Sequence, residues 1–491
     1  MRTAARRLAP TRLGPTLALG LALALAACAT VPAPLEIAES SACRADYLGI
    51  DAKVEAQHAV NAGAHRIEGF PYLRSDRFLA SFRGEVPDGP RFETWVERLR
   101  ALDLASRASE LRNTGWSDPA EELAHLDRCG KAWAVRDLAD AARREQLRQN
   151  AAVPDDYSLL KRTLGVYPLL VPFLNLGMRN FDKDVVADYA RPVEQLESPG
   201  LLTLWQPSDP PAASPAASPA APPPAARWLA QRDALGVPQL DAAQWQALAR
   251  AHLPRWQLET AGEFDKPGAP MLGTDGPRLD LAQPVTYFAP AYTRRGGRVF
   301  AQLVYVVWFS ERPAEGLLNA YSGVLDGVVW RVTLDEQGAP LLYDTVHTCG
   351  CYHYYFPAQL LKRKEQGGFW DEPVLFPQAS VPAEPFAIRL ATGTHFVRRL
   401  VPLAQARADA KAEYSLRDYG ALLSLPSAAE PRSLFGEDGL VDGTDRRERL
   451  WLWPAGIKSA GAMRQLGRHP TSFVGRSHFD DPDLLDKLFE R

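Results

Sequence analysis

Residues 285–309 read VTYFAPAYTRRGGRVFAQLVYVVWF, and this stretch decides the fold of the second half of the chain. β-Branched and aromatic residues dominate both of its flanks, and the pair Gly296-Gly297 lies between them. Such residues favour strands, and a Gly-Gly pair readily adopts the positive φ angles of a tight hairpin turn. The stretch therefore predicts a β-hairpin with strands over residues 285–292 and 299–309.

The same signals predict two further hairpins downstream. One covers residues 328–349 and the other residues 386–400, and each has a glycine in the turn near its centre. Successive hairpins place neighbouring strands antiparallel to one another. We therefore expect residues 283–430 to form a mainly antiparallel β-sheet or sandwich, and residues 431–491 to form a mixed tail.

The chain ahead of this sheet has a helical pattern. Between Gly89 and Gly115 the apolar residues recur at the spacing of one helix face. The next helix is predicted to begin at Asp118-Pro119, where a side-chain cap acceptor is followed by a proline suited to the first helical turn. The predicted fold class is therefore α+β, with a helical region over residues 41–205 before the sheet.

Two segments connect the helical region to the sheet. Residues 206–226 contain almost only Pro, Ala and Ser, so they cannot build a core and are expected to form a linker or a long surface loop. Residues 227–282 are predicted to form a mixed, partly helical connection. The Pro/Ala-rich segment therefore marks the boundary between the two halves of the chain.

Residues 166–176 (VYPLLVPFLNL) form the most hydrophobic segment outside the N-terminus. Two prolines argue against one regular helix through the segment, and it is too short to span a bilayer. The interpretation that we favour is a segment buried in the protein core, because such runs are common inside globular domains. The alternative is an interfacial segment that dips into a membrane surface.

The N-terminus has the three parts of an export signal. Four arginines and no acidic residue accompany an apolar run over residues 17–25, which is too short to span a bilayer. The small residues Ala26 and Ala27 stand directly before Cys28. The string Leu25-Ala26-Ala27-Cys28 resembles the lipobox of bacterial lipoproteins, and this resemblance covers only the N-terminus. The alternative is an ordinary secretory signal with a chance cysteine.

The resemblance carries several implications for location. It implies that residues 1–27 are a signal peptide removed before Cys28, and that Cys28 carries the lipid, with palmitate among its acyl chains. Residue 29 is alanine rather than aspartate, which by the same resemblance implies the outer membrane, with the protein facing the periplasm. Residues 28–40 would then be a tether, and the membrane would be reached through the lipid rather than through a spanning helix.

The charge of the chain argues against nucleic acid as a partner. Loss of residues 1–27 removes four of the 56 basic residues and no acid, which leaves 52 basic against 59 acidic residues and a net charge of −7. A moderately acidic chain has no electrostatic attraction for phosphate backbones. We therefore expect no nucleic-acid partner, and the sequence identifies no protein partner.

Four cysteines remain once Cys28 is assigned to the lipid. An exported chain meets an oxidising compartment, where disulfides form. Cys349 and Cys351 are close in sequence, which leaves Cys43 and Cys129 to pair with each other across a long loop. We therefore predict a Cys43–Cys129 disulfide, with Cys349 bonded either to Cys351 or to another group.

The densest group of reactive side chains is the segment His347-Thr348-Cys349-Gly350-Cys351-Tyr352-His353. It places two imidazoles and two thiols at alternate positions, which in an extended strand would share one face. A regular strand of this length spans about 20 Å, so one metal ion could bind all four side chains only if the chain bends at Gly350.

Three interpretations of this segment remain open. In the first, His347, Cys349, Cys351 and His353, with His395 from a predicted strand, bind Zn or Cu, since thiolates and imidazoles suit both metals. In the second, the two cysteines close a strained, redox-active disulfide. In the third, the residues have structural roles without chemistry.

Familiar catalytic motifs do not decide among these interpretations. The sequence has no Gly-x-Ser-x-Gly elbow, no His-Glu-x-x-His, no phosphate-binding glycine loop and no dinucleotide-binding fingerprint. The leading hypothesis is a cell-envelope lipoprotein that binds a transition metal through residues 347–353. The alternatives are a periplasm-facing redox or hydrolytic enzyme that uses the same segment, and a structural or assembly lipoprotein without chemistry.

Overall fold

The computed structural model describes residues 41–208, 224–314, 316, 319–365 and 372–490. The predicted signal peptide, residues 1–27, and the predicted tether, residues 28–40, lie outside this part, as does most of the predicted linker, residues 209–223. Within the described part, no helix is both long enough and apolar enough to cross a bilayer.

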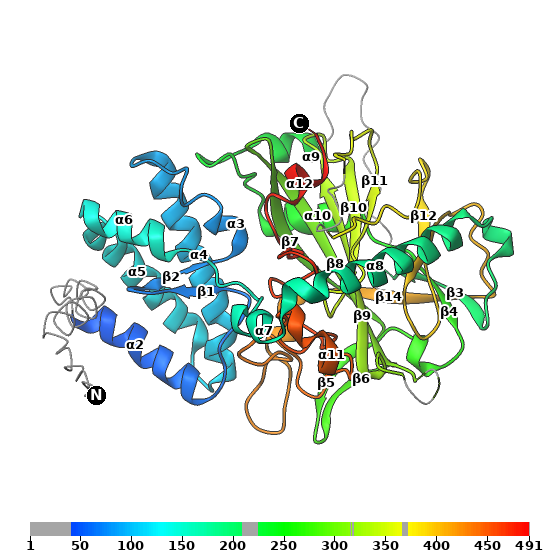
Figure 1. The fold of residues 1–491 in the computed structure, drawn as a ribbon. Helices are drawn as coiled ribbons and strands as arrows, with labels where there is room; N and C mark the ends of the chain where they lie inside the picture. Colours follow the sequence, from blue (N-terminus) through cyan, green and yellow to red (C-terminus); the bar gives the residue numbers. More distant parts are fainter. Residues whose placement is uncertain (1–40, 209–223, 315, 317–318, 366–371, 491) are drawn as a thin grey trace, which may run out of the picture. The chain divides into compact units, whose positions relative to one another are not determined.

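Helices dominate the first part of the described chain, as the sequence predicts (Figure 1). They are α2 (Ser41–Ala56), α3 (Arg77–Ala80), α4 (Pro90–Asn113), α5 (Pro119–Asp137), α6 (Ala141–Asn150), α7 (Leu159–Leu164) and α8 (Tyr167–Ala190). The side chain of Asp118 accepts hydrogen bonds from the backbone N–H groups of Ala120 and Glu121, which confirms the predicted start of α5. A short hairpin of β1 (His65–Ile67) and β2 (Phe70–Ser75), which was not predicted, packs against α4 through β2.

The predicted hairpins form and belong to one ten-stranded sheet. The turn between β7 (Val285–Arg295) and β8 (Arg298–Arg312) uses Gly296 and Gly297, both with positive φ. In sheet order the strands are β11 (Tyr354–Pro357), β10 (Pro340–His347), β9 (Gly323–Leu334), β8, β7, β14 (Ala410–Asp418), β3 (Leu201–Pro207), β4 (Trp256–Thr260), β12 (Phe386–Leu390) and β13 (Val397–Pro402). A separate hairpin joins β5 (Ala269–Gly273) to β6 (Gly276–Asp280).

The sheet is mixed rather than mainly antiparallel, which corrects the prediction. β14 pairs in parallel with both β7 and β3, and β12 pairs in parallel with β4. Hairpin turns identify antiparallel neighbours, whereas these parallel partners are far apart in the sequence and leave no local signal. The prediction of helix was also wrong for β3, which lies at the end of the region predicted to be helical.

Both faces of the sheet are buried. On β8, the odd-numbered residues 301–309 face one core and the even-numbered residues 304–308 face the other. Helices α9 (Pro224–Ala230) and α10 (Ala242–Ala251) contribute to the first core, and the C-terminal segment beyond β14 covers the second. This two-sided burial explains why residues 299–309 are almost continuously apolar.

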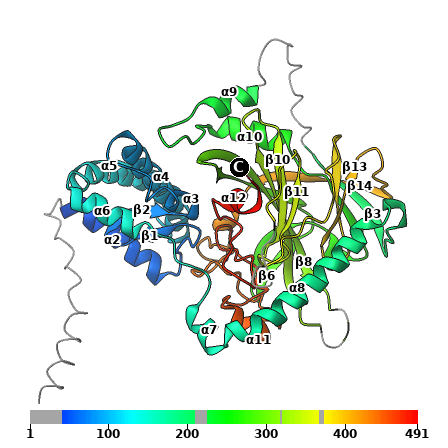
Figure 2. The ribbon, with the colours of Figure 1, turned by 45° about the horizontal axis from the view of Figure 1, so that its top comes forward.

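The C-terminal segment is mixed and mostly irregular. Its short helices are η3 (Tyr419–Leu423), α11 (Arg449–Leu452), η4 (Trp453–Ala455) and α12 (Leu484–Leu488), while η1 (Val193–Gln195) and η2 (Glu263–Asp265) lie earlier in the chain. Figures 1 and 2 both show α8 as a long helix that starts beside α7 and α11 and runs past the sheet.

Two expectations for residues 166–176 are wrong. The segment is part of one helix, α8, in which Pro168 occupies the first turn and Pro172 lies one turn further on. Pro168 loses no helical hydrogen bond in the first turn, and Pro172 removes only the bond to the Pro168 carbonyl. Leu169 and Phe173 are 69% and 73% exposed, so the favoured interpretation of core burial does not hold.

Candidate functional site

The segment 347–353 folds back on itself at Gly350. The N–H of Gly350 donates to the carbonyl of His347 at 2.7 Å, and the N–H of His347 donates to the carbonyl of Cys351 at 2.9 Å. Gly350 has a φ of 90°, and a Cβ at this position would lie 2.5 Å from the carbonyl oxygen of Pro470. The chain therefore makes the bend that a shared metal site requires, and it needs glycine to do so.

The bend does not bring the two imidazoles together. His347 is buried, and its Nδ1 lies 3.6 Å from a carboxylate oxygen of Asp326 on β9. His353 pairs through Nε2 with Asp344 on β10 at 2.8 Å, and its Nδ1 accepts from the hydroxyl of Tyr355 at 2.9 Å. Both nitrogens of His353 are thus used in hydrogen bonds, which leaves no lone pair for a metal.

His395 faces the same carboxylate as His347, that of Asp326. Its Nδ1 lies 2.8 Å from Asp326, and its Nε2 lies 3.5 Å from Asp265 and 3.2 Å from the carbonyl of Phe264. Burial alone would lower the pKa of His395, but the hydrogen bonds to the two carboxylates outweigh burial and raise it. His395 is therefore held as an imidazolium between acceptors, which is a structural arrangement rather than a metal ligand.

Cys349 and Cys351 are free thiols next to each other. A hydrogen bond to Cys349, together with burial, raises the pKa of Cys351 well above its usual range. The thiolate is the form that attacks disulfides and binds metals, so this environment lowers the reactivity of Cys351. In the described part of the chain, no three of the five predicted ligands converge within 4.8 Å. The metal site gains no support from this geometry and stays a prediction.

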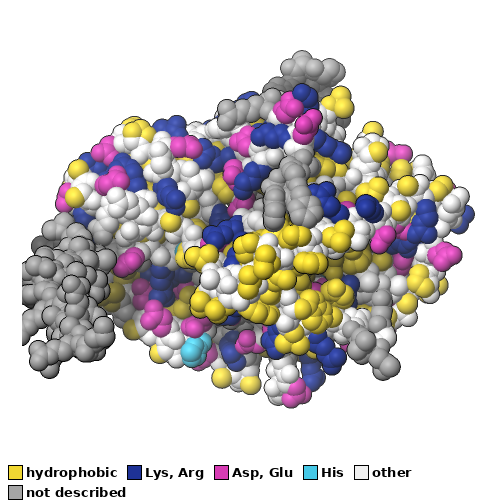
Figure 3. All heavy atoms as spheres, in the orientation of Figure 1, with side chains coloured by type: hydrophobic (Ala, Val, Ile, Leu, Met, Phe, Trp, Pro, Cys, Tyr) yellow, Lys and Arg dark blue, Asp and Glu magenta, His cyan; other side chains and the backbone are white. Residues whose placement is uncertain are grey.

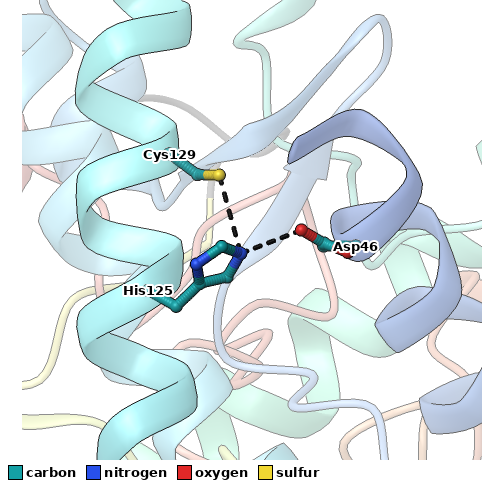
Figure 4. Close-up of side chains that lie close together, drawn as sticks. All are labelled: Asp46, His125 and Cys129. Atoms are coloured by element: carbon teal, nitrogen blue, oxygen red, sulfur yellow. Dashed lines mark hydrogen bonds and ion pairs between the residues drawn. The ribbon is translucent and has the colours of Figure 1, made fainter. Parts of the chain in front are cut away.

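The predicted Cys43–Cys129 disulfide is confirmed, and it joins α2 to α5 with Cα atoms 5.5 Å apart. Beside it, Asp46, His125 and Cys129 hold their ligand atoms within 4.8 Å of one another (Figure 4). His125 Nε2 lies 2.8 Å from Asp46 and 3.8 Å from the sulfur of Cys129. Because that sulfur is bonded to Cys43, it is not available as a thiolate ligand. The oxidised chain therefore has an Asp–His pair at this position rather than a metal centre.

A cavity of about 940 Å³ opens beside the bend. Its walls come from α8, from residues 349–355, from the end of β8 and from the segment around α11. Apolar and aromatic side chains form much of the wall, among them Phe173 and Phe181. A volume of this size falls in the range of small-molecule sites, which are about 300–1,000 Å³.

One guanidinium lines this cavity among aromatic rings. The central carbon of Arg312 lies 5.0 Å from the ring centre of Phe396, 5.6 Å from that of Tyr321 and 5.8 Å from that of Tyr352. Within the described residues, Arg312 makes no ion pair with a carboxylate at 4.0 Å or less. The rings stabilise the cation, and the hydroxyl of Tyr352 takes one of its hydrogen bonds. The guanidinium keeps further N–H donors for a ligand.

Three of the four carboxyl groups that line the same cavity hold their protons more tightly than usual. Burial raises the pKa of Glu372 to about 8, that of Glu448 to about 7 and that of Asp182 to about 6. Glu372 accepts a hydrogen bond from the N–H of Val474 at 2.8 Å. At neutral pH Glu372 is mostly protonated, so it can donate a hydrogen bond into the cavity, while Glu448 is the carboxyl whose pKa Arg312 lowers in opposition to burial.

The cavity residues had little signal in the sequence. Cys349, Cys351 and His353 were identified as candidates, whereas Arg312 and Glu372 were missed because each stands alone in the sequence and reaches the cavity only through the fold. His125 and Cys129 were separated by one helical turn on a predicted helix, a spacing that could have identified their proximity. No family model, curated protein or solved structure matches the chain.

Proposed function

We propose that the protein is a cell-envelope lipoprotein whose cavity binds an amphipathic anion, a molecule with an apolar body and an acidic head. The observation that carries the binding proposal is the position of Arg312, a cation that makes no ion pair at 4.0 Å or less among the described residues, in a cavity whose wall combines apolar and aromatic side chains with carboxyl groups of raised pKa. The proposed anchor is lipid on Cys28, which holds the protein at the outer membrane, facing the periplasm. The support for this anchor is the lipobox-like string that ends at Cys28.

The two ends of such a ligand match different parts of the cavity. Burial of an alkyl chain against the apolar wall contributes about 0.8 kcal/mol for each methylene group. A carboxylate or phosphate head can form charge-assisted hydrogen bonds with Arg312, and these are stronger than neutral ones. The protonated Glu372 can add a further hydrogen bond. A neutral apolar ligand would leave the guanidinium unpaired, which favours an anion.

Binding of dodecanoate, kept below its micelle concentration, tests the proposal. Titration calorimetry on the chain from Ala29 onward is expected to show binding, and Arg312→Gln is expected to weaken it at least tenfold, because a hydrogen bond to a charged group contributes about 1.5–3 kcal/mol. Arg278→Gln is the matched control, since Arg278 is exposed on β6 and pairs with Asp275. Equal affinity in the Arg312 variant and the parent would rule out this site.

The anchor is tested separately by mass spectrometry of the N-terminal peptide from the full chain. A peptide that begins at Cys28 and carries acyl chains is expected, and Cys28→Ser should abolish the acylation. A mature N-terminus elsewhere, with an unmodified Cys28, would contradict the anchor and leave the binding measurement unaffected.

A second candidate function is redox chemistry at Cys349 and Cys351, and the observation that favours it is their adjacency in the cavity wall. Oxidation would join the two sulfurs and pass two electrons and two protons to a disulfide of a partner, which is thereby reduced to two thiols. The raised pKa of Cys351 weighs against this role. Thiol mapping after exposure to oxidised and reduced glutathione tests it, and metal analysis of the same sample tests the predicted Zn or Cu.

A further inference from the structure

Apolar side chains are exposed together on α7, α8 and the α11–η4 segment. The apolar face is defined here by Leu160, Leu164, Leu169, Phe173, Trp451 and Trp453. Their exposed fractions run from 38% for Trp453 to 73% for Phe173, which is unusual for leucine, phenylalanine and tryptophan. Figure 3 shows hydrophobic side chains gathered over α7 and α8, in the region where Figure 1 places these helices.

The parts of this face are held against each other by hydrogen bonds. Arg162 of α7 donates from Nε to the carbonyl of Ala455 at 2.7 Å, and the N–H of Ser158 donates to the carbonyl of Gly456 at 2.8 Å. These contacts fix α7 beside η4, the short helix that begins at Trp453. The face is therefore a preformed surface and not a set of unrelated exposed residues.

The charges around the apolar face are mostly positive. Residues 157–181 include Lys161, Arg162 and Arg179 and no acidic residue. Residues 442–458 include three exposed basic residues, Arg447, Arg449 and Lys458, and two exposed acids, Asp442 and Asp445, while Arg446 and Glu448 are buried. The pKa of Lys161 is lowered by burial and by the nearby cations Lys458 and Arg464, which is the effect expected of a positive potential.

Two of the exposed cations beside the face have acidic partners. Arg449 pairs with Asp445, and Lys458 pairs with Asp438 at 2.7 Å. Lys161 and Arg447 carry no such pair with a carboxylate among the described residues. Asp442 is exposed beside Lys161 and Trp453, so the net positive charge that borders the apolar face is modest. A second copy of the chain docked through the same face would bring like charges together, which disfavours a dimer here.

We propose that the apolar face lies in the headgroup region of an anionic lipid membrane. Leucine, phenylalanine and tryptophan with flanking lysine and arginine are the composition of surfaces that rest in this region, where the rings and alkyl groups insert and the cations meet lipid phosphates. The choice of a membrane as the occupant rests on the proposed anchor at Cys28. Residues 29–40 can extend over about 40 Å, so the lipid would keep the folded chain close to a bilayer.

The cavity opens on this same face. Phe173 and Trp451 belong both to the apolar face and to the cavity wall. Docking would therefore place the mouth of the cavity at the lipid headgroups, where amphipathic anions partition. A ligand could pass between bilayer and cavity without crossing water, and the face would serve as the entrance to the proposed binding site.

Flotation with lipid vesicles tests the docking independently of the anchor. The chain from Ala29 onward has no acylated cysteine and no signal sequence, and it retains the compact unit that begins at Ala42. It is expected to float with vesicles of phosphatidylglycerol and phosphatidylcholine, and more weakly with phosphatidylcholine alone. Leu160→Asp with Leu169→Asp is expected to reduce the bound fraction at least tenfold, since both side chains are exposed and neither lines the cavity.

Val135→Asp is the matched control, because Val135 is 77% exposed on α5, away from the apolar face. Its flotation should equal that of the parent, and dodecanoate binding in solution should be unchanged in the double variant. No flotation of the parent on anionic vesicles would overturn the proposal, as would equal flotation of the double variant. A stable dimer that the double variant dissociates would overturn it as well, because a second copy would then be the occupant.

Discussion

His395 is held by Asp326, with its Nδ1 2.8 Å from a carboxylate oxygen, and its ring stacks on Phe309 at 3.9 Å between ring centres. On the other side, Nε2 faces Asp265 in η2. One imidazolium thus connects β9, η2 and the turn between β12 and β13, which lie far apart in the sheet order. The side chain of His395 is 1% exposed, so water does not screen its interactions. The connection therefore depends on the charges of His395, Asp326 and Asp265.

The contribution of His395 to stability should depend on pH. Its pKa is raised in the folded chain, so the charged form is stabilised by folding. That contribution is complete below about 6.5, the ordinary pKa of histidine, and is lost as pH rises through the raised folded value. His395→Gln should therefore lower the free energy of unfolding in urea by about 3–5 kcal/mol at pH 6 and by less at pH 9.

His469→Gln is a control whose effect on stability should change with pH in the opposite direction. Burial lowers the pKa of His469 to about 3, and its Nε2 lies 3.0 Å from the carbonyl of Thr348. The stability that depends on neutral His469 is present above pH 6.5 and is lost as pH falls toward the folded pKa. The difference from the parent should therefore shrink toward low pH. If the loss of stability changed with pH in the same direction in both variants, at least one assignment, the charged His395 or the neutral His469, would be wrong.

The Cys43–Cys129 disulfide should stabilise the helical part of the chain. It closes a loop with a sequence separation of 86 residues, and loss of loop entropy in the unfolded chain predicts a contribution of about 4–5 kcal/mol. Cys43→Ser should lower the midpoint of thermal unfolding of the purified chain by several degrees. The same variant assayed with and without reductant is its own control, because reductant should then have no further effect on that midpoint.

Zinc binding should appear when the disulfide is removed. In Cys43→Ser the thiol of Cys129 is free beside Asp46 and His125, and these three side chains can supply a sulfur, a nitrogen and an oxygen ligand. We expect zinc uptake by Cys43→Ser, none at this site in the oxidised parent, and none in Cys43→Ser with His125→Ala. Stoichiometric zinc in the oxidised parent, lost with His125→Ala, would show that Cys129 is not needed.

Binding of an anionic ligand in the cavity should weaken as pH rises through about 8, the pKa of Glu372. Below this pH the carboxyl is protonated and can donate to the ligand, and above it a negative charge faces the ligand's head. Dodecanoate stays ionised over this range, so the change belongs to the protein. Titration calorimetry should show a loss of several-fold in affinity from pH 7 to pH 9 for the parent and a smaller loss for Glu372→Gln, in which Glu448 still titrates.

The parts of the fold that were predicted correctly are those encoded by neighbouring residues. The β7–β8 hairpin depends on Gly296-Gly297 and on the strand-forming residues beside it, and α5 begins where Asp118 caps it. The parallel pairing of β14 with β7 depends on residues that are separated by most of the sheet region, so no local pattern identifies it. The hairpin signals therefore could not predict the mixed topology of the sheet.

In the candidate site, too, the features set by neighbouring residues were predicted and those set by distant residues were not. Gly350 identified the bend, because its neighbours and its conformational freedom are local properties. The partners of the histidines are set by strand register and strand order, which place Asp344 beside His353 and Asp326 beside His347. His353 therefore pairs with one carboxylate, while His347 and His395 both face another, and a sequence pattern of alternating histidine and cysteine does not reveal these pairings.

A fully buried charge cluster in the helical part offers a test of its energetics. Arg74 on β2 binds Glu110 on α4 through two hydrogen bonds of 2.8 and 2.7 Å and binds Asp103 at 3.0 Å, and all three side chains are 0% exposed. Arg74→Met would leave Glu110 buried without its counter-ion, at a cost of about 3–5 kcal/mol in the free energy of unfolding.

Replacement of both partners should be less damaging than replacement of one. In Arg74→Met with Glu110→Leu the unpaired carboxylate is gone, and Asp103 keeps its hydrogen bond from Arg107 at 2.8 Å. A double-mutant cycle in urea should therefore show the double variant as more stable than Arg74→Met alone. Arg278→Met is the exposed control, expected to change stability by less than about 0.5 kcal/mol. A double variant no more stable than Arg74→Met would mean that the ion pair contributes through packing rather than through charge compensation.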